Sequence, residues 1–324
     1  MSKAIRIHEY GGPEVLQWED VPAPEPGPGE ALILQHAVGL NYIDIYYRTG
    51  VYKVPGFPAV LGMEGAGVVE AVGPGVTSLA PGDRVAYSSS FGSYATRRVV
   101  AVDRLVKLPD SIDFTTAAGM MLRGLTVQAL LRQVRPLQAG DTILVHAAAG
   151  GIGLLMCQWA SHLGARVIGV VSTPEKAEVA RANGAVAAIV GLHDLAAQVK
   201  HITDGAMVPV VYDSVGKDSF IASLDCLAPR GLMVSFGNAS GEVTGVNLSQ
   251  LSSRGSLYVT RPTLMSFIAT RQALESSAAE LFEMVRTGAV KITVGQQFAL
   301  QEAAEAHRAM ESRATTGSTV LIPG

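Results

Sequence analysis

Residues 141–160 read DTILVHAAAGGIGLLMCQWA, and this stretch decides the fold class. The apolar run 141–145 predicts a short strand that ends directly in a turn of alanines and glycines at 147–153. The apolar run that begins at 154 predicts a helix. This order of elements is typical of a loop that binds a dinucleotide phosphate. It is also found where a strand and a helix merely pack closely, so both interpretations stand at this point.

The alternation of strand and helix continues from this stretch to about residue 260. Further strand candidates lie at 166–172, 187–190, 209–215, 231–236 and 256–260. Helical segments separate them, at 154 to about Gly164, from Pro174 onward, at 193–202 and at 218–227. Strands that alternate with helices in this way predict a doubly wound parallel sheet with helices on both faces.

The chain on either side of this region has a different pattern. Residues 1–120 contain short apolar runs between turns rich in proline and glycine, at 23–30 and 73–76, which predicts an antiparallel, barrel-like domain. The tail predicts a helix at 271–287, a strand at 296–300, a helix at 301–312 and a strand at 318–322, and we expect it to rejoin the first domain. The predicted domains are 1–123 with 263–324, and 124–262.

The composition limits the classes of protein. Of 324 residues 48% are hydrophobic and only 16% are charged, which suits large cores such as a covered parallel sheet. The net charge of -3 indicates no attraction to nucleic acid or to an anionic membrane. Two cysteines, Cys157 and Cys226, are too few for a disulfide framework, and no apolar run is long enough for a signal peptide or a membrane span. We therefore expect a cytoplasmic protein.

The turn after the first strand aligns with the dinucleotide pattern G-x-G-x-x-G, with alanine in the first glycine place. The aligned residues are Ala148, Ala149, Gly150, Gly151, Ile152 and Gly153. Free N–H groups and the helix dipole stabilise a pyrophosphate at such a turn. In this register Gly150 allows the backbone to approach the phosphates, and Gly153 allows the helix to pack against the strand. We predict a dinucleotide site here in preference to a packing turn.

The end of the next strand indicates which dinucleotide is bound. NAD sites usually carry an acidic residue there, which binds the ribose 2′-hydroxyl. This chain has Ser172 instead, with Lys176 four residues later, and a hydroxyl beside an ammonium suits a 2′-phosphate. The ordinary alternative is that Lys176 is a solvated helix lysine, and the neighbouring Glu175 is a signal against a phosphate. We predict NADPH.

At this point the sequence resembles a known family, the medium-chain dehydrogenase/reductases, and within it the zinc-independent quinone oxidoreductases, the zeta-crystallin-like branch. The resemblance covers the whole chain. It is carried by GGPEVL (11–16), GLNYIDIYYRTGVY (39–52), LGMEGAGVVEAVG (61–73), GDRVAY (82–87), RGLTVQALL (123–131), HAAAGGIG (146–153), YDSVG (212–216), RGLMVSFGNASG (230–241), GSLYVTRP (255–262) and ESRATTGSTVLIP (311–323). It implies an α/β protein with a GroES-like β-barrel catalytic domain and a Rossmann domain.

The resemblance also implies the site residues. It places Asn41, Tyr42 and Tyr46 beside the nicotinamide, Tyr52 at the outer cleft, and the Thr126 hydroxyl facing the nicotinamide. Of these, Asn41, Tyr46, Tyr52 and Thr126 are the catalytic candidates. Further cofactor contacts are expected at Gly216, Phe236, Gly237, Asn238, Thr260, Arg261 and Arg313. The ordinary alternatives are packing tyrosines, a helix threonine that bonds back to a carbonyl, and a surface arginine.

The resemblance has two departures with chemical meaning. Zinc-dependent relatives carry Cys where this chain has Asn41 and His where it has Met63, and neither an amide nor a thioether is a usual zinc ligand. We therefore expect no metal, and a substrate that is already an electrophile. Relatives also commonly carry an aromatic residue after the third strand, whereas residues 190–193 read VGLH, and His193 is more typical of a helix start. Asp44 and Glu64 form no obvious acid–base pair.

These observations predict an NADPH:quinone oxidoreductase that transfers a hydride or electrons without a metal. An NADPH-dependent enal or enone reductase is the alternative enzyme, and an RNA-binding or structural, crystallin-like protein is the non-enzymatic alternative. A short-chain dehydrogenase is disfavoured because Tyr212 and Tyr258 are followed four residues on by Gly216 and Pro262 instead of lysine. The resemblance also implies a homodimer paired through the last strand of the sheet, around 255–260.

Overall fold

The computed structural model describes residues 2–312 and 315–324, which form two compact units. Unit 1 comprises Met1–Leu125, Ile268–Thr287 and Ile292–Gly324, and unit 2 comprises Thr126–Phe267 and Gly288–Lys291. The chain after Phe267 thus belongs to unit 1, except for the short segment Gly288–Lys291. That segment stays with unit 2 because Gln158 accepts a hydrogen bond from the Lys291 N–H at 2.6 Å. The predicted extents of the catalytic and cofactor domains stay predictions.

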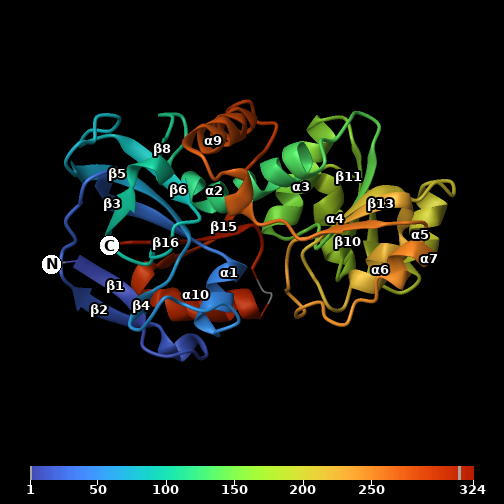
Figure 1. Cartoon of the computed structure of the whole chain (residues 1–324), viewed down its shortest axis with the longest axis horizontal. Coiled ribbons are helices and arrows are strands. Elements are labelled where there is room, and N and C mark those ends of the chain that lie inside the picture. The colour runs from blue at the N-terminus through green and yellow to red at the C-terminus, as the bar shows by residue number, and fades with distance from the viewer. Residues whose placement is uncertain (1, 313–314) are drawn as a thin grey trace. The chain divides into compact units, whose positions relative to one another are not determined.

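Unit 1 is built on β-sheets (Figure 1). One sheet has the order β2-β1-β4 and the other the order β15-β16-β3-β5-β6-β8, with β7 also paired to β3. All pairs are antiparallel except β15 with β16. The strands are β1 Ser2–Ile7, β2 Gln17–Val21, β3 Glu30–Leu40, β4 Ala59–Val60, β5 Glu64–Val72, β6 Arg84–Ser88, β7 Arg97–Ala101, β8 Val106–Lys107, β15 Val294–Ala299 and β16 Ser318–Ile322.

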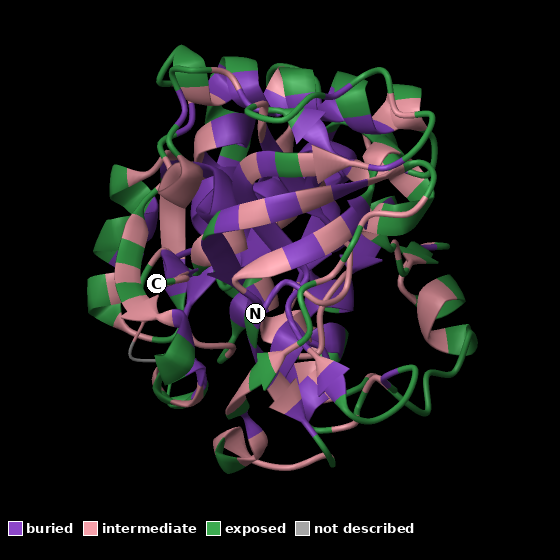
Figure 2. Cartoon of the chain, turned by 90° about the vertical axis from the view of Figure 1, so that its left-hand side faces the viewer, coloured by how far each residue is buried: buried purple, intermediate pink, exposed green. Residues whose placement is uncertain are grey.

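The tail completes unit 1. β16 pairs with β3, and Ala303, Ala306 and Met310 of α10 enter the same apolar cluster as Ile5 of β1. Figure 2 shows the buried residues on the strands and on the inner faces of the helices. The helices are α1 Tyr42–Arg48, α9 Arg271–Arg286, α10 Ala303–Glu311, the single turns η1 Pro13–Val15, η2 Val102–Arg104 and η4 Leu300–Glu302, and α2 Phe114–Gln128, whose last residues belong to unit 2.

Unit 2 is a doubly wound parallel sheet, which confirms the predicted fold class. Its strand order is β11-β10-β9-β12-β13-β14, and every pair is parallel. The strands are β9 Thr142–His146, β10 Arg166–Val171, β11 Ala185–Val190, β12 Val208–Asp213, β13 Leu227–Ser235 and β14 Tyr258–Thr260. The helices are η3 Ala129–Val134, α3 Gly151–His162, α4 Pro174–Ala182, α5 Leu195–Ile202, α6 Phe220–Asp225, α7 Ser249–Ser253 and α8 Leu264–Phe267.

The central strands of unit 2 are largely apolar, as expected of a sheet that helices cover on both faces. Leu144 of β9 packs in one cluster with Val199 of α5 and Leu224 of α6. Its neighbours Ile143 and Val145 are also buried and point to the opposite face. The short helices α7 and α8 are not predicted by the sequence, since neither shows the periodicity of a longer helix. In the described part of the chain, no helix is both long and apolar enough to cross a membrane.

The strand order places the chain reversal of this sheet between β9 and β12. From β9 the chain continues outward through β10 to β11, and it then returns to add β12, β13 and β14 on the other side. In open α/β sheets, ligands bind outside the carboxyl ends of the strands at such a reversal. The predicted glycine turn follows β9 and therefore lies at this position.

Candidate active site

The glycine turn leads directly from β9 into α3. Gly150 is the N-cap of α3, with extended backbone angles (φ -81°, ψ 171°) and no side chain to cap the helix. A Cβ on Gly153 would lie 2.2 Å from the Ala147 carbonyl oxygen, so this glycine is required for close packing of helix and turn. A Cβ on Gly150 would meet only that same oxygen, at 3.2 Å. The turn therefore packs tightly on one side and leaves Gly150 exposed on the other, which fits a phosphate.

The residues predicted to bind the 2′-phosphate come together at the end of β10. The Lys176 ammonium lies 3.3 Å from the Ser172 hydroxyl, and Ser172 is exposed. Thr173 caps α4 by accepting a hydrogen bond from the Lys176 N–H at 3.3 Å. The exposed Glu175 carboxylate also interacts with Thr173, whose hydrogen bond lowers the pKa of Glu175. The pair of Ser172 and Lys176 thus presents a donor and a cation beyond β10.

The segment after β11 lacks an aromatic ring, as the sequence shows. Val190 is 42% exposed, and Gly191 has the positive φ of +78° that a side chain rarely adopts. The His193 side chain is exposed, with Nδ1 3.0 Å from the carboxylate of the adjacent Asp194. His193 therefore pairs locally beside the start of α5, as expected of a helix-start histidine.

The loops that follow β12 and β13 hold one another closely. A Cβ on Gly216 would lie 2.6 Å from the Gly241 carbonyl oxygen, and one on Gly237 would lie 2.3 Å from that of Ser214. Arg261, just after β14, donates to the carbonyl oxygens of Ser235 and Gly237 at 3.1 and 3.0 Å. The contacts with the cofactor that are predicted for these loops stay predictions. They involve Gly216, Phe236, Gly237, Asn238, Thr260 and Arg261. Within the structure, Arg261 braces the loop after β13.

In unit 1, the predicted tyrosines form one aromatic cluster around α1. The ring centroids of Tyr42 and Tyr46 are 6.2 Å apart, and those of Tyr46 and Tyr52 are 5.4 Å apart. The cluster extends to two rings that the sequence does not single out, Tyr47, 5.6 Å from Tyr52, and Phe91, 5.0 Å from Tyr47. The tyrosine rings are half-buried, so they pack against each other and keep part of each face accessible.

Asn41 is held by two buried carboxyl groups, which sequence reasoning missed. Its side-chain amide donates to one oxygen of Glu64 at 2.6 Å, and the Leu122 N–H donates to the other, also at 2.6 Å. Its backbone N–H donates to Asp44 at 2.8 Å. Asp44 and Glu64 are both fully buried. The motif GMEGAG around Glu64 is the signal that could have indicated this role.

Burial raises the pKa of both carboxyl groups. The pKa of Asp44 rises to about 7 through desolvation and, further, through the negative charge of Glu64. The pKa of Glu64 also rises to about 7 through desolvation, although the nearby Arg123 guanidinium opposes the change. Both Glu64 oxygens accept hydrogen bonds, whereas Oδ1 of Asp44 has no partner among the described residues. A proton is therefore placed at lower cost on Asp44, with Glu64 left ionised opposite Arg123.

A chain of hydrogen bonds leads from Asp44 to α10. The Tyr94 hydroxyl donates to Asp44 at 3.2 Å and lies 3.0 Å from Nε2 of His307. Nδ1 of His307 lies 3.0 Å from Arg48, which also pairs with Glu311 at 2.6 Å. Because Arg48 can only donate, His307 is neutral with its proton on Nε2. Burial, followed by the charge of Arg48, lowers the pKa of His307 to about 3, which is consistent with this tautomer.

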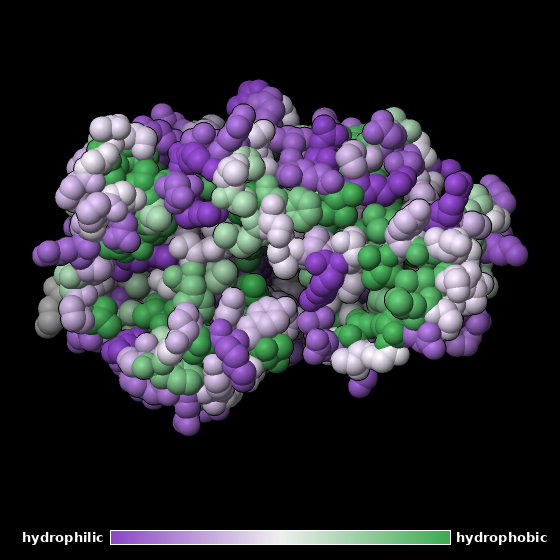
Figure 3. Space-filling view, viewed as in Figure 1, coloured by the Kyte–Doolittle hydropathy of each residue, from purple (hydrophilic) through white to green (hydrophobic). Residues whose placement is uncertain are grey.

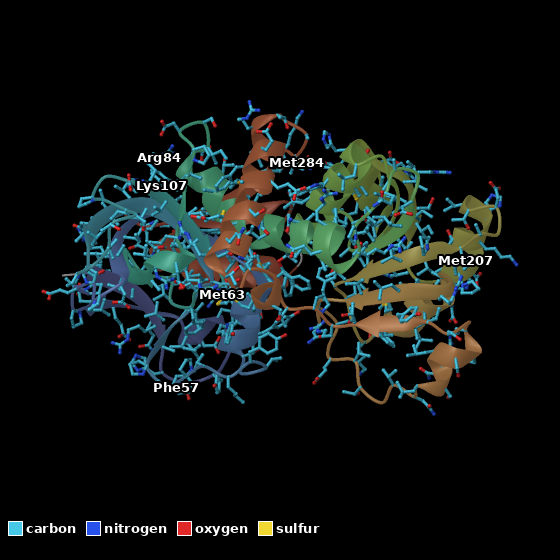
Figure 4. All side chains as sticks on the ribbon, turned by 45° about the horizontal axis from the view of Figure 1, so that its top comes forward. Phe57, Met63, Arg84, Lys107, Met207 and Met284 are labelled. Atoms are coloured by element: carbon cyan, nitrogen blue, oxygen red, sulfur yellow. The ribbon has the colours of Figure 1, made fainter. Side chains whose placement is uncertain are left out.

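Asn41 and Met63 stand at the positions where zinc-dependent relatives have zinc ligands, and their side chains do not suit that metal. The Asn41 amide is engaged by Glu64, and Met63, the residue before β5 that Figure 4 labels, offers a buried thioether. Over residues 2–312 and 315–324, no three or more His, Cys, Asp or Glu side chains are grouped as a metal site requires. The absence of a metal stays a prediction.

Two further predicted residues complete the set. Thr126 lies in the last turn of α2 and is half-buried. Arg313 lies outside the described residues, so its predicted contact is not placed.

Comparisons with known proteins agree with this architecture. Residues 27–110 match the family model described as alcohol dehydrogenase GroES-like domain, and residues 151–285 match the one described as zinc-binding dehydrogenase. The chain is 56% identical over 325 residues to a quinone oxidoreductase of Pseudomonas aeruginosa, with 100% of both chains covered. It is 44% identical over 331 residues to a 2-haloacrylate reductase of a Burkholderia species, covering 100% of this chain and 99% of that one.

Among solved structures, a quinone oxidoreductase of Escherichia coli complexed with NADPH has a TM-score of 0.97 and 46% identity. The match covers 99% of this chain and 100% of that one. Identity of this extent over whole chains establishes the family together with the fold. The chain belongs to the quinone oxidoreductase branch of the medium-chain dehydrogenase/reductase superfamily.

Proposed function

We propose that this chain is an NADPH-dependent quinone reductase. The main observation in favour of NADPH is the pair of Ser172 and Lys176, 3.3 Å apart. They lie at a strand end where an NAD enzyme usually has an acidic residue. The names of the relatives support the same cofactor and substrate class, since one is a quinone oxidoreductase and a solved relative holds NADPH.

The chain fits this cofactor at two places in unit 2. The exposed Gly150 and the uncapped start of α3 suit the pyrophosphate, and Ser172 with Lys176 suits the 2′-phosphate. NADPH supplies a hydride when it is bound. The residues proposed to contact it are Asn41, Tyr42, Tyr46, Thr126, Ala149, Gly150, Gly151, Ile152, Gly153, Ser172, Lys176, Gly216, Phe236, Gly237, Asn238, Thr260, Arg261 and Arg313.

The residues proposed to act on the acceptor are Asn41, Tyr46, Tyr52 and Thr126. The rings of Tyr46 and Tyr52 present apolar faces against which a planar quinone packs. A phenol O–H of the same cluster donates to the quinone oxygen where negative charge develops. Glu64 and Asp44 orient Asn41 from behind, so that its amide is fixed before the acceptor binds. Because the acceptor is already electrophilic, no Lewis acid is needed to activate it.

The test is the oxidation of NADPH, followed by absorbance, with several acceptors side by side. We expect turnover of 1,2-naphthoquinone and 1,4-benzoquinone, unaffected by a chelator, and slow turnover of trans-2-hexenal. NADH serves as the control for cofactor selection. Failure of every quinone with NADPH would contradict the proposed function.

A second candidate activity is the NADPH-dependent reduction of an activated alkene. It is favoured by the similarity to the 2-haloacrylate reductase, which shares the whole length of the chain. Both activities use the same cofactor residues and differ in the acceptor. Rapid turnover of trans-2-hexenal with inactive quinones would identify the alkene reductase.

We expect a charge reversal at the 2′-phosphate site to exchange the cofactor preference. In the variant Ser172→Asp/Lys176→Ala, a carboxylate replaces the hydroxyl and the cation is lost. Removal of the charged contacts and addition of a repulsive charge should raise the KM for NADPH by about 100-fold, or about 3 kcal/mol. The KM for NADH should fall, because the new carboxylate can accept from the 2′-hydroxyl. Lys200→Ala, on α5, is the matched control, and an unchanged NADPH preference in the double variant would show that the two residues do not bind the phosphate.

The proposed assembly is a homodimer. β14 pairs only with β13 in the described sheet, so its other edge is open. Figure 3 shows apolar residues on the surface of unit 2, in the part where Figure 1 labels α6 and α7. Exposed apolar side chains of unit 2 include Ile221, Val246, Leu248, Tyr258 and Val259. Light scattering during gel filtration measures the mass directly, and a monomer would contradict the dimer.

A cytoplasmic location is proposed because Cys157 and Cys226 are both free thiols.

A further inference from the structure

A buried polar cluster lies at the carboxyl ends of β9 and β12. It comprises His146, Asp213, Ser219 and Ser223, each at most 2% exposed. The first two are the last residues of β9 and β12, and the two serines come from the start of α6 and its middle. No role in the proposed reaction uses any of the four.

Asp213 is the centre of this cluster. One of its oxygens accepts from the hydroxyls of Ser219 at 2.6 Å and Ser223 at 3.0 Å. The other accepts from the backbone N–H groups of Val215 at 2.7 Å and Gly216 at 3.2 Å. Four donors thus surround a carboxylate that has no exposed surface. The carboxylate in turn fixes the backbone of the turn that follows β12.

The direction of the hydrogen bonds excludes a nucleophilic serine. Ser223 gives its single proton to Asp213, so it accepts a proton from Nε2 of His146, 2.9 Å away. In a hydrolytic triad the histidine instead accepts the proton of the serine. Burial lowers the pKa of His146, so the neutral ring donates without carrying a charge. The hydrogen bonds therefore donate in one direction, from His146 to Ser223 and from Ser223 to Asp213. This direction fits a structural network and not a nucleophilic serine.

The cluster connects two segments that flank the chain reversal. His146 immediately precedes the glycine turn 147–153, and Asp213 immediately precedes the turn 214–216. The second turn is bound to the loop after β13, since the Ser240 hydroxyl donates to the Val215 carbonyl at 2.9 Å and accepts from the Asp218 N–H at 3.0 Å. A dinucleotide places its adenosine ribose at the end of β10 and its pyrophosphate at α3. Its nicotinamide half therefore lies on the other side, over β12 and β13.

We propose that His146, Ser223 and Asp213 are positioning residues that hold the turn 214–216 in register with the glycine turn, so that this turn receives the nicotinamide ring. The proposal rests on the proposed function, because it takes NADPH as the ligand. The glycine turn 147–153 and the turn 214–216 consist mostly of small residues, so their own side chains offer little to hold them in place. The buried hydrogen bonds supply that rigidity before the cofactor arrives, which lowers the entropy cost of ordering the site.

The decisive experiment compares two ligands that differ only at the nicotinamide ring. Calorimetric titration of Ser223→Ala should give a Kd for NADPH about tenfold above wild type, the usual effect of a lost buried hydrogen bond. The Kd for 2′-phospho-ADP-ribose, which lacks the ring, should change less than about twofold. Ser318→Ala is the matched control, because Ser318 is also a buried serine, lies in unit 1 and donates to the Gly119 carbonyl at 2.6 Å. It should leave both constants at the wild-type value.

A pair of variants at His146 separates positioning from simple packing. His146→Gln keeps an N–H donor toward Ser223 and should bind NADPH about as tightly as wild type. His146→Leu keeps the apolar volume but has no donor, and should match Ser223→Ala. Equal affinities of the two variants, or equal weakening of both ligands in Ser223→Ala, would overturn the proposal. A wild-type protein that binds neither ligand would instead overturn the proposed function and is recognised by that first titration.

Discussion

Gly150→Val should bind NADPH at least about 100-fold more weakly than wild type while the chain stays folded, a loss of about 3 kcal/mol. The extended backbone of Gly150 accepts any residue, and a new Cβ meets only one atom within contact distance, the Ala147 oxygen at 3.2 Å. The valine side chain therefore enters the exposed space in which the pyrophosphate must approach the backbone. Calorimetric titration with NADPH measures the effect.

Two comparison variants make this result specific to the phosphate. Gly56→Val places the same side chain in unit 1, where a Cβ has no neighbour within 4 Å, and should leave affinity and stability unchanged. Gly153→Ala should instead lower stability by about 1–3 kcal/mol, because its Cβ would press on the backbone of the turn. Wild-type affinity in Gly150→Val would show that the turn serves packing alone.

Asp44→Asn and Glu64→Gln should differ strongly in their effect on stability, although both remove one buried carboxyl group. In Asp44→Asn the new amide nitrogen takes the place of the oxygen that has no partner, and the other oxygen keeps its donors. In Glu64→Gln an amide nitrogen faces an N–H donor in either orientation, and Arg123 loses its counter-ion. We expect a change within about 1 kcal/mol near neutral pH for Asp44→Asn, and a loss of at least about 3 kcal/mol for Glu64→Gln.

The pH dependence of stability follows from the raised pKa values. A carboxyl group with a pKa of about 7 in the folded state binds a proton that the unfolded state, with a pKa near the ordinary value of 3.8, has already released. The free energy of unfolding therefore falls as the pH rises from about 4 to about 7 and levels off above 7. Asp44→Asn lacks this group, so its free energy of unfolding should fall less than that of wild type between about pH 4 and about pH 7.

Urea unfolding at the two ends of this pH range measures both effects. The difference between variant and wild type isolates the single carboxyl group, because the other titrating groups are common to both proteins. Parallel curves for Asp44→Asn and wild type would show that Asp44 is ionised throughout. A stable Glu64→Gln would show that Glu64, and not Asp44, carries the proton.

The sequence predicted those parts of the site that depend on neighbouring residues. The glycine turn, the strand that precedes it and the Ser172–Lys176 pair all lie within short segments, so periodicity and spacing suffice to indicate them. Tyr42 and Tyr46 were implied by the family resemblance, and their spacing of one helical turn places them on the same face of a helix. Phe91, by contrast, joins this cluster from a distant loop, and no local pattern marks it.

The buried carboxyl groups could not be predicted from local patterns. Glu64, on β5, reaches Asn41 at the start of α1, and His307 reaches Tyr94 from a segment more than 200 residues away in the sequence. Their charge states depend on desolvation, which exists only once the chain has folded. A reader of the sequence sees two ordinary acids at 44 and 64, whereas the folded protein contains a pair with raised pKa values around one arginine.

The sequence by itself determined the parallel sheet, the glycine turn and the family, because these depend on apolar periodicity, on glycines at short spacing and on motifs along the whole chain. Only the tertiary structure decided which polar groups are desolvated together and in which direction their hydrogen bonds run. The Asp44–Glu64 pair and the His146–Ser223–Asp213 cluster both arise from residues on separate elements. The raised pKa values of Asp44 and Glu64 and the neutral state of His146 follow from burial and from long-range contacts, which no stretch of sequence contains.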